Sequence, residues 1–374
     1  VKEGASDVHI EVEEHRLVVR FRIDGVLREV IEPQRALAPL LASRLKVMGK
    51  LDIAEKRLPQ DGRVSLRVGG YELDVRISTL PSQYGERVVL RLLDRGQTKL
   101  GIAHLGMDDA DRARFERIVE APEGLVLVTG PTGSGKTTSL YAALHRLNDR
   151  KRNILTVEDP IEYAMDGIGQ MQVNAKTDLT FARGLRALLR QDPDVIMVGE
   201  IRDAETAKIA VESAMTGHLV LSTLHTNSAV GAVSRLIDMG VERFLLAPMV
   251  RGLVAQRLVR RLCPDCAEPH PLTEADAALI GQALAPSHAV RRPVGCAACA
   301  GQGYRGRLPL YEIVEGSSRM AALIHDGASE AALKEEARRT SPGILQDGAT
   351  KLAEGQTSVA ELARAVRDDA AAGG

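Results

Sequence analysis

Residues 125–147 read LVLVTGPTGSGKTTSLYAALHRL, and this stretch decides the fold of the second part of the chain. The four apolar residues 125–128 are typical of a short buried strand, and leucines recur after the glycines at helical spacing, at 140, 144 and 147. Between strand and helix, residues 130–137 match the phosphate-loop pattern, in which a second glycine is followed by lysine and a hydroxyl residue. Strand, loop and helix therefore follow one another in the order that nucleotide binding requires.

The chemistry of such a loop follows from its residue types. Glycines let backbone N–H groups turn toward a phosphate, and the N-terminus of the following helix adds a positive dipole. Lys136 would reach the β- and γ-phosphates, and the hydroxyl of Thr137 would hold Mg²⁺. An accidental glycine-rich turn is the alternative, which the flanking strand and helix disfavour. We expect a nucleoside triphosphate to contact Gly130, Pro131, Thr132, Gly133, Ser134, Gly135, Lys136, Thr137 and Thr138.

Composition limits the classes of protein that remain. A length of 374 residues favours two or three domains, and 44% apolar with 26% charged residues is ordinary for a soluble protein. A net charge of −1 and only 3% aromatic residues argue against a nucleic-acid partner. No apolar run reaches the roughly 18 residues of a membrane span, and no signal peptide opens the chain. We expect a cytoplasmic protein without a transmembrane segment, and, because it begins at Val1 rather than at Met, a fragment.

The first part of the chain reads as an α+β domain. Two alternating runs within residues 17–30 flank Asp24-Gly25, a strong hairpin signal, and residues 34–48 carry apolar side chains at helical spacing. Three further alternating segments predict strands at 63–68, 71–77 and 87–93. The pattern then lapses, so we place this domain at residues 1–95 and a linker at 96–106.

Strands and helices alternate through the second part of the chain. Apolar runs at 153–157, 194–198 and 219–224 follow or precede helical segments at 110–119, 181–189 and 204–214. This order predicts an α/β phosphate-loop core over residues 107–262, with a largely parallel sheet covered by helices on both faces. Ligands of such sheets bind beyond the carboxyl ends of the strands. Four strand ends therefore converge on one crevice, carrying Gly130, Glu158, Glu200 and His225.

The polar residues at these strand ends are the catalytic candidates. Glu200 could position or deprotonate the attacking water. Most phosphate-loop enzymes carry an Asp at such a strand end to hold Mg²⁺, but here the residue before Glu200 is Gly199. Glu158 is therefore the best-placed carboxylate to hold Mg²⁺ together with Thr137. His225 could sense the nucleotide by donating a hydrogen bond. The alternatives are solvated loop acids and a structural histidine, and the sequence does not decide which glutamate is base and which is metal carboxylate.

Two sets of arginines stand out among many. Arg183, Arg186 and Arg190 lie at helical spacing, and Arg76 and Arg91 lie on predicted strands of the first domain. Guanidinium groups supplied from another domain or subunit stabilise charge in phosphoryl transfer. Solvated or salt-bridged surfaces explain these arginines equally well. The basic run at 256–261, QRLVRR, is interpreted as a solvated helix face.

The four cysteines form two C-x-x-C pairs, Cys263 with Cys266 and Cys296 with Cys299. Four thiolates make the closed tetrahedral set of a structural zinc site, and a redox dithiol is the alternative. The 29 intervening residues (267–295) exceed the usual spacing, which indicates an inserted loop or helix. We place a zinc-binding subdomain at 263–310 and a C-terminal helical region at 311–374.

Several longer segments resemble one family. Residues 6–10 (SDVHI), 51–63 (LDIAEKRLPQDGR), 157–162 (VEDPIE), 189–194 (LRQDPD), 199–203 (GEIRD), 216–227 (TGHLVLSTLHTN), the phosphate loop and the paired cysteines are similar to the secretion/pilus assembly ATPases. The resemblance runs from Ser6 to about Ile313. Within the family, residues 181–186 (FARGLR) and 237–245 (IDMGVERFL) are most similar to the type II secretion ATPases, with the type IV pilus extension ATPases as the alternative.

The resemblance implies a fold and a set of roles. It implies a PAS-like first domain, a RecA-like core and a homohexameric ring, with ATP bound between the first and second domains. It assigns Lys136 and Thr137 to the phosphate loop, Glu158 to an acidic "Asp box", Glu200 to the Walker B glutamate and His225 to a "His box". From the many arginines it selects Arg76, Arg91, Arg186 and Arg190, and it implies zinc at Cys263, Cys266, Cys296 and Cys299.

The resemblance also implies a function. It implies a protein-secreting ATPase on the cytoplasmic face of the bacterial inner membrane, whose hydrolysis of ATP powers pseudopilus assembly and export through the type II secretion system. Members dock on inner-membrane platform proteins through a further N-terminal domain, which the sequence lacks, and the stroke would lie in a hinge near residues 94–106. A nucleic-acid translocase and a nucleotide-dependent scaffold are less favoured. One departure is residues 306–312, GRLPLYE, where the family usually has GRTGIYE; it puts the local turn in doubt, not the activity.

Overall fold

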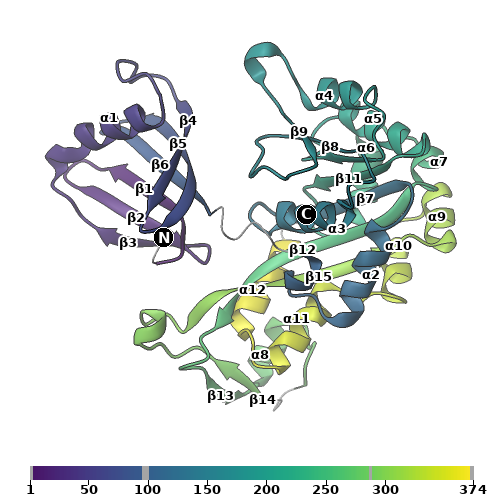
Figure 1. Cartoon of the computed structure of the whole chain (residues 1–374). Helices are drawn as coiled ribbons and strands as arrows, with labels where there is room; N and C mark the ends of the chain where they lie inside the picture. Colours follow the sequence, from purple (N-terminus) through teal and green to yellow (C-terminus); the bar gives the residue numbers. More distant parts are fainter. Residues whose placement is uncertain (1–2, 95–100, 286–288, 371–374) are drawn as a thin grey trace. The chain divides into compact units, whose positions relative to one another are not determined.

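The computed structural model describes residues 3–94, 101–285 and 289–370 (Figure 1). The chain divides into two compact units, Val1–Lys99 and Leu100–Gly374, which we call unit 1 and unit 2 and describe separately. Residues 96–100 of the predicted linker lie outside the described part of the chain.

Unit 1 is a six-stranded sheet with one helix on it. The strand order is β3-β2-β1-β6-β5-β4, and each paired strand runs antiparallel to its neighbour. At the predicted hairpin, Asp24 and Gly25 adopt positive φ of 49° and 85°, the conformation that a tight two-residue turn requires. The elements are β1 (Ala5–Val12), β2 (Leu17–Ile23), β3 (Val26–Ile31), a 3₁₀ turn (Arg35–Leu37), α1 (Ala38–Met48), β4 (Gln60–Val68), β5 (Tyr71–Ser82) and β6 (Gly85–Asp94).

The two faces of this sheet differ in character because side chains alternate along each strand. Ile10, Val12, Val75 and Val88 are buried in one cluster with Ala42 of α1. The residues between them on the strands are mostly charged and form the opposite face. Strand β1 itself was not among the segments that the sequence pattern predicted.

Unit 2 is built on a seven-stranded sheet of order β15-β12-β7-β11-β10-β8-β9. The strands from β12 to β9 run parallel, and β15 pairs antiparallel with β12 at the edge. The predicted α/β phosphate-loop fold is thereby confirmed. The strands are β7 (Gly124–Thr129), β8 (Ile154–Glu158), β9 (Gly169–Gln172), β10 (Val195–Val198), β11 (Leu219–Leu224), β12 (Val250–Leu262) and β15 (Tyr304–Glu315).

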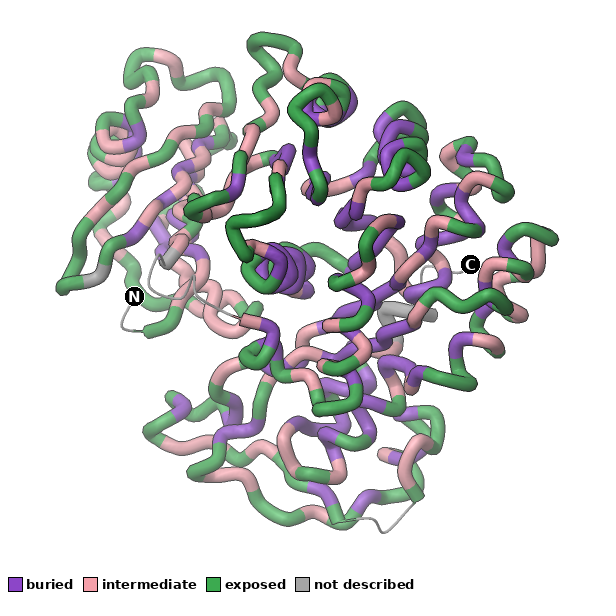
Figure 2. The backbone as a smooth tube through the Cα atoms, turned by 45° about the vertical axis from the view of Figure 1, so that its right-hand side comes forward, coloured by how far each residue is buried: buried purple, intermediate pink, exposed green. Residues whose placement is uncertain are grey.

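Helices cover both faces of this sheet, as the alternation of strands and helices predicted. Along β7, Val126 and Val128 face a cluster with α2 (Asp109–Val119) and α3 (Lys136–Leu147). Leu125 and Leu127 face the other way, toward α4 (Phe181–Leu188), α5 (Ala204–Met215) and α6 (Gly231–Asp238). Strands β7, β10 and β11 are consequently buried along their whole length (Figure 2).

The cysteine region and the C-terminal helices belong to the same compact unit. Leu272 and Val290, which lie within the segment between the two cysteine pairs, share a core with Leu352 and Leu362 near the end of the chain. The division at residues 262/263 and 310/311 stays a prediction. The remaining elements are α7 (Arg243–Leu246), β13 (Glu268–Pro271), α8 (Glu274–Leu279), β14 (Ala289–Arg292), a 3₁₀ turn (Ala297–Cys299), α9 (Ser318–His325), α10 (Glu330–Arg338), α11 (Ile344–Ala353) and α12 (Val359–Ala370).

The second half of the predicted linker packs into unit 2. Residues Ile102–His104 form a 3₁₀ turn, and Ile102 and Leu105 are only 5% and 6% exposed. The hydroxyl of Tyr311 on β15 donates to the carbonyl of Leu105 at 3.0 Å. None of the helices in the described residues combines the length and apolar character needed to span a bilayer.

Candidate nucleotide-binding site

The phosphate loop follows β7 and ends in the first turn of α3. Gly130, Gly133 and Gly135 adopt positive φ of 146°, 78° and 91°. A Cβ at Gly130 would lie 2.3 Å from the carbonyl oxygen of Gln256 on the neighbouring strand β12, and one at Gly135 would lie 2.7 Å from the side-chain nitrogen of the same residue. The positive φ favours glycine at both positions, and at Gly130 the backbone of Gln256 also leaves no space for a side chain.

Lys136 lies almost buried across the loop. Its Nζ donates to the carbonyls of Gly130 and Pro131 at 2.7 and 3.1 Å. Burial lowers the pKa of Lys136 to about 8, an effect that the nearby carboxylate of Glu200 opposes and the guanidinium of Arg257 reinforces. A phosphate would satisfy this ammonium better than two carbonyls do, because the interaction would be charge-assisted.

The outer rim of the loop is open to solvent. Pro131, Thr132 and Gly133 are exposed, as are Thr137 and Thr138 in the first turn of α3. The hydroxyl of Thr137 is therefore accessible where a metal bound to the phosphates would need it. The donors and the cradle fit the triphosphate and Mg²⁺ that the sequence predicts.

Glu200 follows β10, which pairs with β11, the strand that carries His225, and β11 in turn pairs with β7, the strand that carries the loop. Its Oε1 accepts a hydrogen bond from Arg202 Nη2 at 2.6 Å, and its Oε2 lies 3.8 Å from His225 Nε2. Two residues of the same segment thus have local roles: Arg202 pairs with Glu200, and the side chain of Asp203 caps α5 by accepting from the backbone N–H of Thr206 at 2.8 Å.

His225 follows β11 and is half exposed. Its pKa is lowered by burial first and by the charge of Lys136 second, while Glu200 acts in the opposite direction. Lys136 at the start of α3, Glu200 after β10 and His225 after β11 are therefore close enough to affect one another's charge. Of the four residues expected to converge, Glu200 and His225 lie near one another and near the phosphate-loop residue Lys136.

Glu158 lies differently from the expectation. It ends β8, is 2% exposed, and has both carboxylate oxygens occupied. Oε2 accepts from the Tyr141 hydroxyl on α3, and Oε1 accepts from Thr156 Oγ1 at 2.5 Å and Gln170 Nε2 at 3.1 Å. In this arrangement both oxygens of the Glu158 carboxylate accept hydrogen bonds inside the protein.

The four arginines selected from the sequence lie on two units. In unit 2, Arg186 on α4 pairs with Glu205 at 2.5 Å, and the following Arg190 donates to the carbonyl of Arg186 at 2.8 Å. In unit 1, Arg76 on β5 and Arg91 on β6 are directly opposite each other in the sheet.

Two residues beside the loop, Gln256 and Arg257, were not predicted and lie on the segment that was interpreted as a solvated helix face. That interpretation is wrong, because residues 256–261 lie on β12 in the central sheet. Gln256 Oε1 accepts from Ser139 of α3 at 2.8 Å, and the 2%-exposed Arg257 donates to the carbonyl of Asn227 at 2.7 Å. The two side chains join the loop and its helix to the segment that follows His225.

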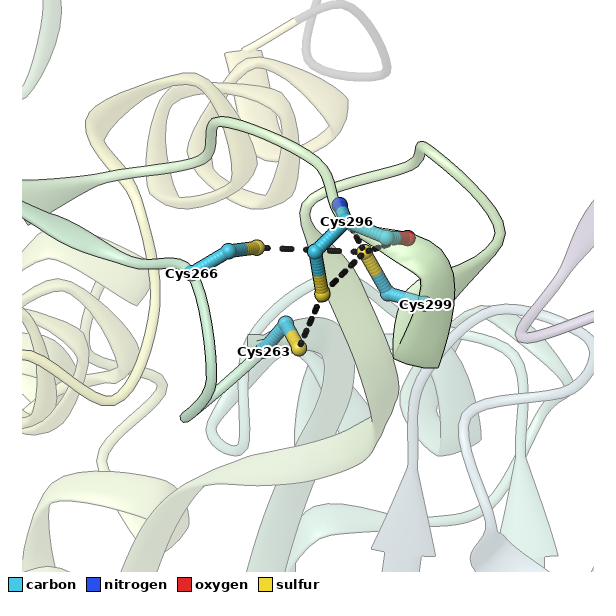
Figure 3. Close-up of side chains that lie close together, drawn as sticks. All are labelled: Cys263, Cys266, Cys296 and Cys299. Carbon is cyan, nitrogen blue, oxygen red and sulfur yellow. Dashed lines mark hydrogen bonds between the residues drawn. The ribbon is translucent and has the colours of Figure 1, made fainter.

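The four cysteines form a compact cluster, with every pair of sulfurs within 4.8 Å (Figure 3). Sγ–Sγ distances are 3.9 Å for Cys263–Cys296 and 3.8 Å for both Cys266–Cys299 and Cys296–Cys299. Four thiolates bound tetrahedrally to zinc with bonds of roughly 2.3 Å have sulfurs about 3.8 Å apart. The cluster therefore has the dimensions of a zinc site.

Backbone N–H groups favour the thiolate form that a metal requires. Those of Cys296 and Gly303 donate to Cys299 Sγ at 3.2 and 3.1 Å, and that of Gly295 donates to Cys266 Sγ at 3.3 Å. The hydrogen bonds from Cys296 and Gly303 lower the pKa of Cys299 to about 6.

Comparisons with known proteins agree with this fold and site. The family model described as Type II/IV secretion system protein matches residues 1–364. The chain is 61% identical to the type II secretion system protein E of Pseudomonas aeruginosa, covering 99% of this chain and 74% of that protein. It is 56% identical to the type II secretion system ATPase E of Vibrio cholerae, covering 98% of this chain and 73% of that protein.

Two solved structures are similar over nearly the whole chain. The pilus retraction motor PilT with bound ADP matches with a TM-score of 0.67 and 26% identity, covering 97% of this chain and 94% of that one. The ATPase DotB of Legionella pneumophila matches with a TM-score of 0.72 and 22% identity, covering 98% and 93%, which shows a shared fold.

Fold and site together define a phosphate-loop NTPase with a RecA-like core. Within that class, the chain belongs to the Type II/IV secretion system protein family. The predicted family is confirmed. The curated relatives support function as a type II secretion ATPase, and they do not favour the alternative of a pilus extension ATPase.

Proposed function

We propose that this chain hydrolyses ATP at the phosphate loop and that the hydrolysis powers pseudopilus assembly in type II secretion. The observation that carries the proposal is the convergence of Lys136, Glu200 and His225 from three strand ends. With Mg²⁺ bound, the metal would neutralise charge on the transferring phosphoryl group. The chain itself supplies the backbone cradle, the ammonium of Lys136 and the carboxylate of Glu200.

Glu200 is the residue that we assign to the attacking water. One of its oxygens is held by Arg202 at 2.6 Å, and the other lies toward His225 at 3.8 Å. The bond from Arg202 fixes the carboxylate in one orientation, and the oxygen beside His225 is left to accept a proton or orient a water. A change in charge at the nucleotide would alter the interactions of His225 and so affect the position of the segment that follows it.

Glu158 takes a supporting role in this proposal. Since its oxygens bind Tyr141, Thr156 and Gln170, it would anchor α3 to β8 and β9 rather than coordinate magnesium. Mg²⁺ would be held by Thr137, phosphate oxygens and water, which suits its preference for retaining several waters.

The remaining assignments follow from family membership. We propose that Arg76, Arg91, Arg186 and Arg190 stabilise charge on the phosphates within a homohexameric ring. The ring would act on the cytoplasmic face of the inner membrane, bound to platform proteins of the type II secretion system. We also propose that Cys263, Cys266, Cys296 and Cys299 hold a structural zinc ion.

The direct test is a turnover assay. The wild-type chain is expected to release phosphate from ATP, and Lys136→Ala should abolish this because the β- and γ-phosphates lose their ammonium. Lys151→Ala, an exposed lysine outside the loop, is the matched control and should retain turnover. Equal turnover in wild type and Lys136→Ala would overturn the proposed function.

A further inference from the structure

The buried side chain of Arg257 lies between the phosphate loop and the segment that follows His225. Arg257 is on β12 and only 2% exposed. Its Nη1 donates to the carbonyl of Gln256 at 3.2 Å and lies 3.2 Å from the place that a Cβ on Gly130 would take. Its Nη2 donates to the carbonyl of Asn227 at 2.7 Å. One guanidinium group therefore lies against the first residue of the loop and also holds the segment after His225.

The same segment is bound to the end of β7 by a second set of hydrogen bonds. The hydroxyl of Thr129, directly before the loop, accepts from the backbone N–H of Thr226 at 2.8 Å and lies 2.6 Å from the Thr226 hydroxyl. Strands β7 and β12 pair with each other, so Thr129 and Arg257 hold the segment from two neighbouring strands. Because both contacts reach main-chain atoms of residues 226–227, a displacement of the loop and its strand would move these residues.

Arg257 also acts on the loop through its charge. Lys136 Nζ donates to the carbonyl of Gly130 at 2.7 Å, and the positive charge of Arg257 adds to burial in lowering the pKa of Lys136. Glu200 has the opposite effect on Lys136, and the charge of Lys136 in turn lowers the pKa of His225. Lys136 and Arg257 repel each other until an anion binds between or beside them. A phosphate in the loop would therefore change the forces on Arg257 and on the segment that it holds.

We propose that Arg257 is a positioning residue that couples occupancy of the phosphate loop to the placement of His225. The proposal rests on the proposed function, because the ligand whose binding is transmitted is the nucleotide. A guanidinium group suits this role, since its N–H groups point in fixed and different directions within one plane. The ammonium of a lysine at this position would keep the charge, but it would not hold the loop and Asn227 in one fixed geometry.

Hydrogen exchange with the slowly hydrolysed analogue Mg–ATPγS tests the coupling without relying on turnover. In the wild type, saturating analogue should slow amide exchange both in the loop, residues 130–138, and in residues 226–231. In Arg257→Lys the loop should still be protected, while the protection of residues 226–231 should fall at least about threefold, because local opening there no longer depends on the loop. Arg261→Lys, exposed on the same strand, is the matched control and should behave as the wild type.

The outcomes separate this proposal from the proposed function. Protection of neither segment in the wild type would overturn the proposed function and the coupling with it. Protection of the loop alone in the wild type would overturn only the coupling. Equal protection of residues 226–231 in the wild type and in Arg257→Lys would show that the coupling does not pass through Arg257.

Kinetics and pH give readouts that a purely structural arginine would not change. Arg257→Lys should lower kcat about tenfold, because His225 is misplaced, and leave KM within about threefold, because the charge beside the loop is kept. Arg257→Met removes that charge, so the pKa of Lys136 should rise, and the loss of Mg–ATPγS affinity between pH 7 and 9.5 should begin at a higher pH. The other charged group that acts on Lys136, Glu200, is kept in both variants, and His225, whose pKa is lowered, stays neutral over this range. A kcat of Arg257→Lys within twofold of Arg261→Lys, or an unshifted pH profile in Arg257→Met, would contradict the role of Arg257.

Discussion

Lys136 carries its charge in a site from which water is largely excluded, and this shapes how the loop can bind a nucleotide. Burial lowers its pKa to about 8, from an ordinary value of 10.5. Phosphate oxygens would favour the charged form and raise the pKa again. Binding of a nucleotide and protonation of Lys136 are therefore linked.

This linkage predicts a pH dependence of affinity. Below pH 8 the free protein already carries the proton, so the Kd of Mg–ATPγS should be nearly constant. Above pH 8 a proton must be taken up on binding, so the affinity should fall by up to about tenfold per pH unit. Fluorescence titration between pH 7 and 9.5 measures this. Lys136→Gln should bind weakly and without this slope; the same slope in both proteins would contradict the assignment.

The short chain of hydrogen bonds around Glu158 is a second residue-level feature. Tyr141 is 1% exposed, and its hydroxyl is bound to a carboxylate that is itself 2% exposed. Burial of Tyr141 and the neighbouring charge of Glu158 both raise the tyrosine pKa far above its usual range. The hydroxyl therefore stays protonated and remains a donor to Glu158.

Tyr141→Phe removes this donor and leaves Glu158 with two partners. We expect the free energy of unfolding to fall by about 1–3 kcal/mol, the usual cost of a buried polar group that loses its hydrogen bond. Urea unfolding measures the change. Tyr163→Phe is the matched control, because the ring of Tyr163 packs against Tyr141 at a centroid distance of 4.5 Å and the donor to Glu158 is kept. Equal losses in the two variants would contradict the special role of Tyr141.

At the scale of elements, the strand ends could be predicted and the neighbouring strand β12 could not. Apolar runs marked β7, β8, β10 and β11, and the rule that ligands bind at their carboxyl ends placed Glu200 and His225 near Lys136. Strand β12 was not predicted because residues 256–261, QRLVRR, include polar residues such as Gln256 and Arg257, which are unusual in a central strand. Their partners, Ser139 and Asn227, lie far away in the sequence. No local pattern indicates such contacts.

The hydrogen-bond partners of Glu158 could not be predicted from local sequence patterns either. The end of an apolar strand indicated a carboxylate near the site, but the burial of that carboxylate depends on Tyr141 and Gln170 from two other segments. The spacing of the cysteines, by contrast, was sufficient to predict a four-thiolate cluster, because two C-x-x-C turns that meet leave few other arrangements.

The cysteine cluster gives an element-scale prediction. Wild-type protein should contain about one zinc ion per chain, and Cys296→Ser should lose it and unfold at a lower temperature, because a structural site contributes folding free energy. Elemental analysis and thermal unfolding provide the two measurements. His270→Ala, which removes a nearby histidine bound to Asp276 at 3.4 Å, should keep the metal. Full zinc content in Cys296→Ser would contradict the site.

At the scale of the whole molecule, the chain consists of two units, each with its own core. The chain divides between Lys99 and Leu100, inside the linker predicted at residues 96–106, and Ile102 and Leu105 are buried in unit 2. A stretch without hydrophobic periodicity indicates a segment that connects two domains. It does not indicate which residues of that segment are buried.

The oligomeric state of the protein gives a prediction at the scale of the whole molecule. If arginines supplied by other copies act on the phosphates, nucleotide should favour a ring. Sedimentation should show a shift toward six-chain particles with Mg–ATPγS, and Lys136→Ala should not respond. Monomers under both conditions at concentrations where turnover is observed would contradict a ring requirement.

The central claim is that Glu200 acts on water at a nucleotide held by the loop. Glu200→Gln keeps the size of the side chain and removes its ability to accept a proton. Positioned proton transfer contributes roughly 10²–10⁴ in rate. Phosphate release should therefore fall at least about a hundredfold, while the Kd of Mg–ATPγS should stay within about threefold of wild type, and Glu212→Gln, on the exposed side of α5, should behave as wild type. Retained phosphate release by Glu200→Gln would contradict the account.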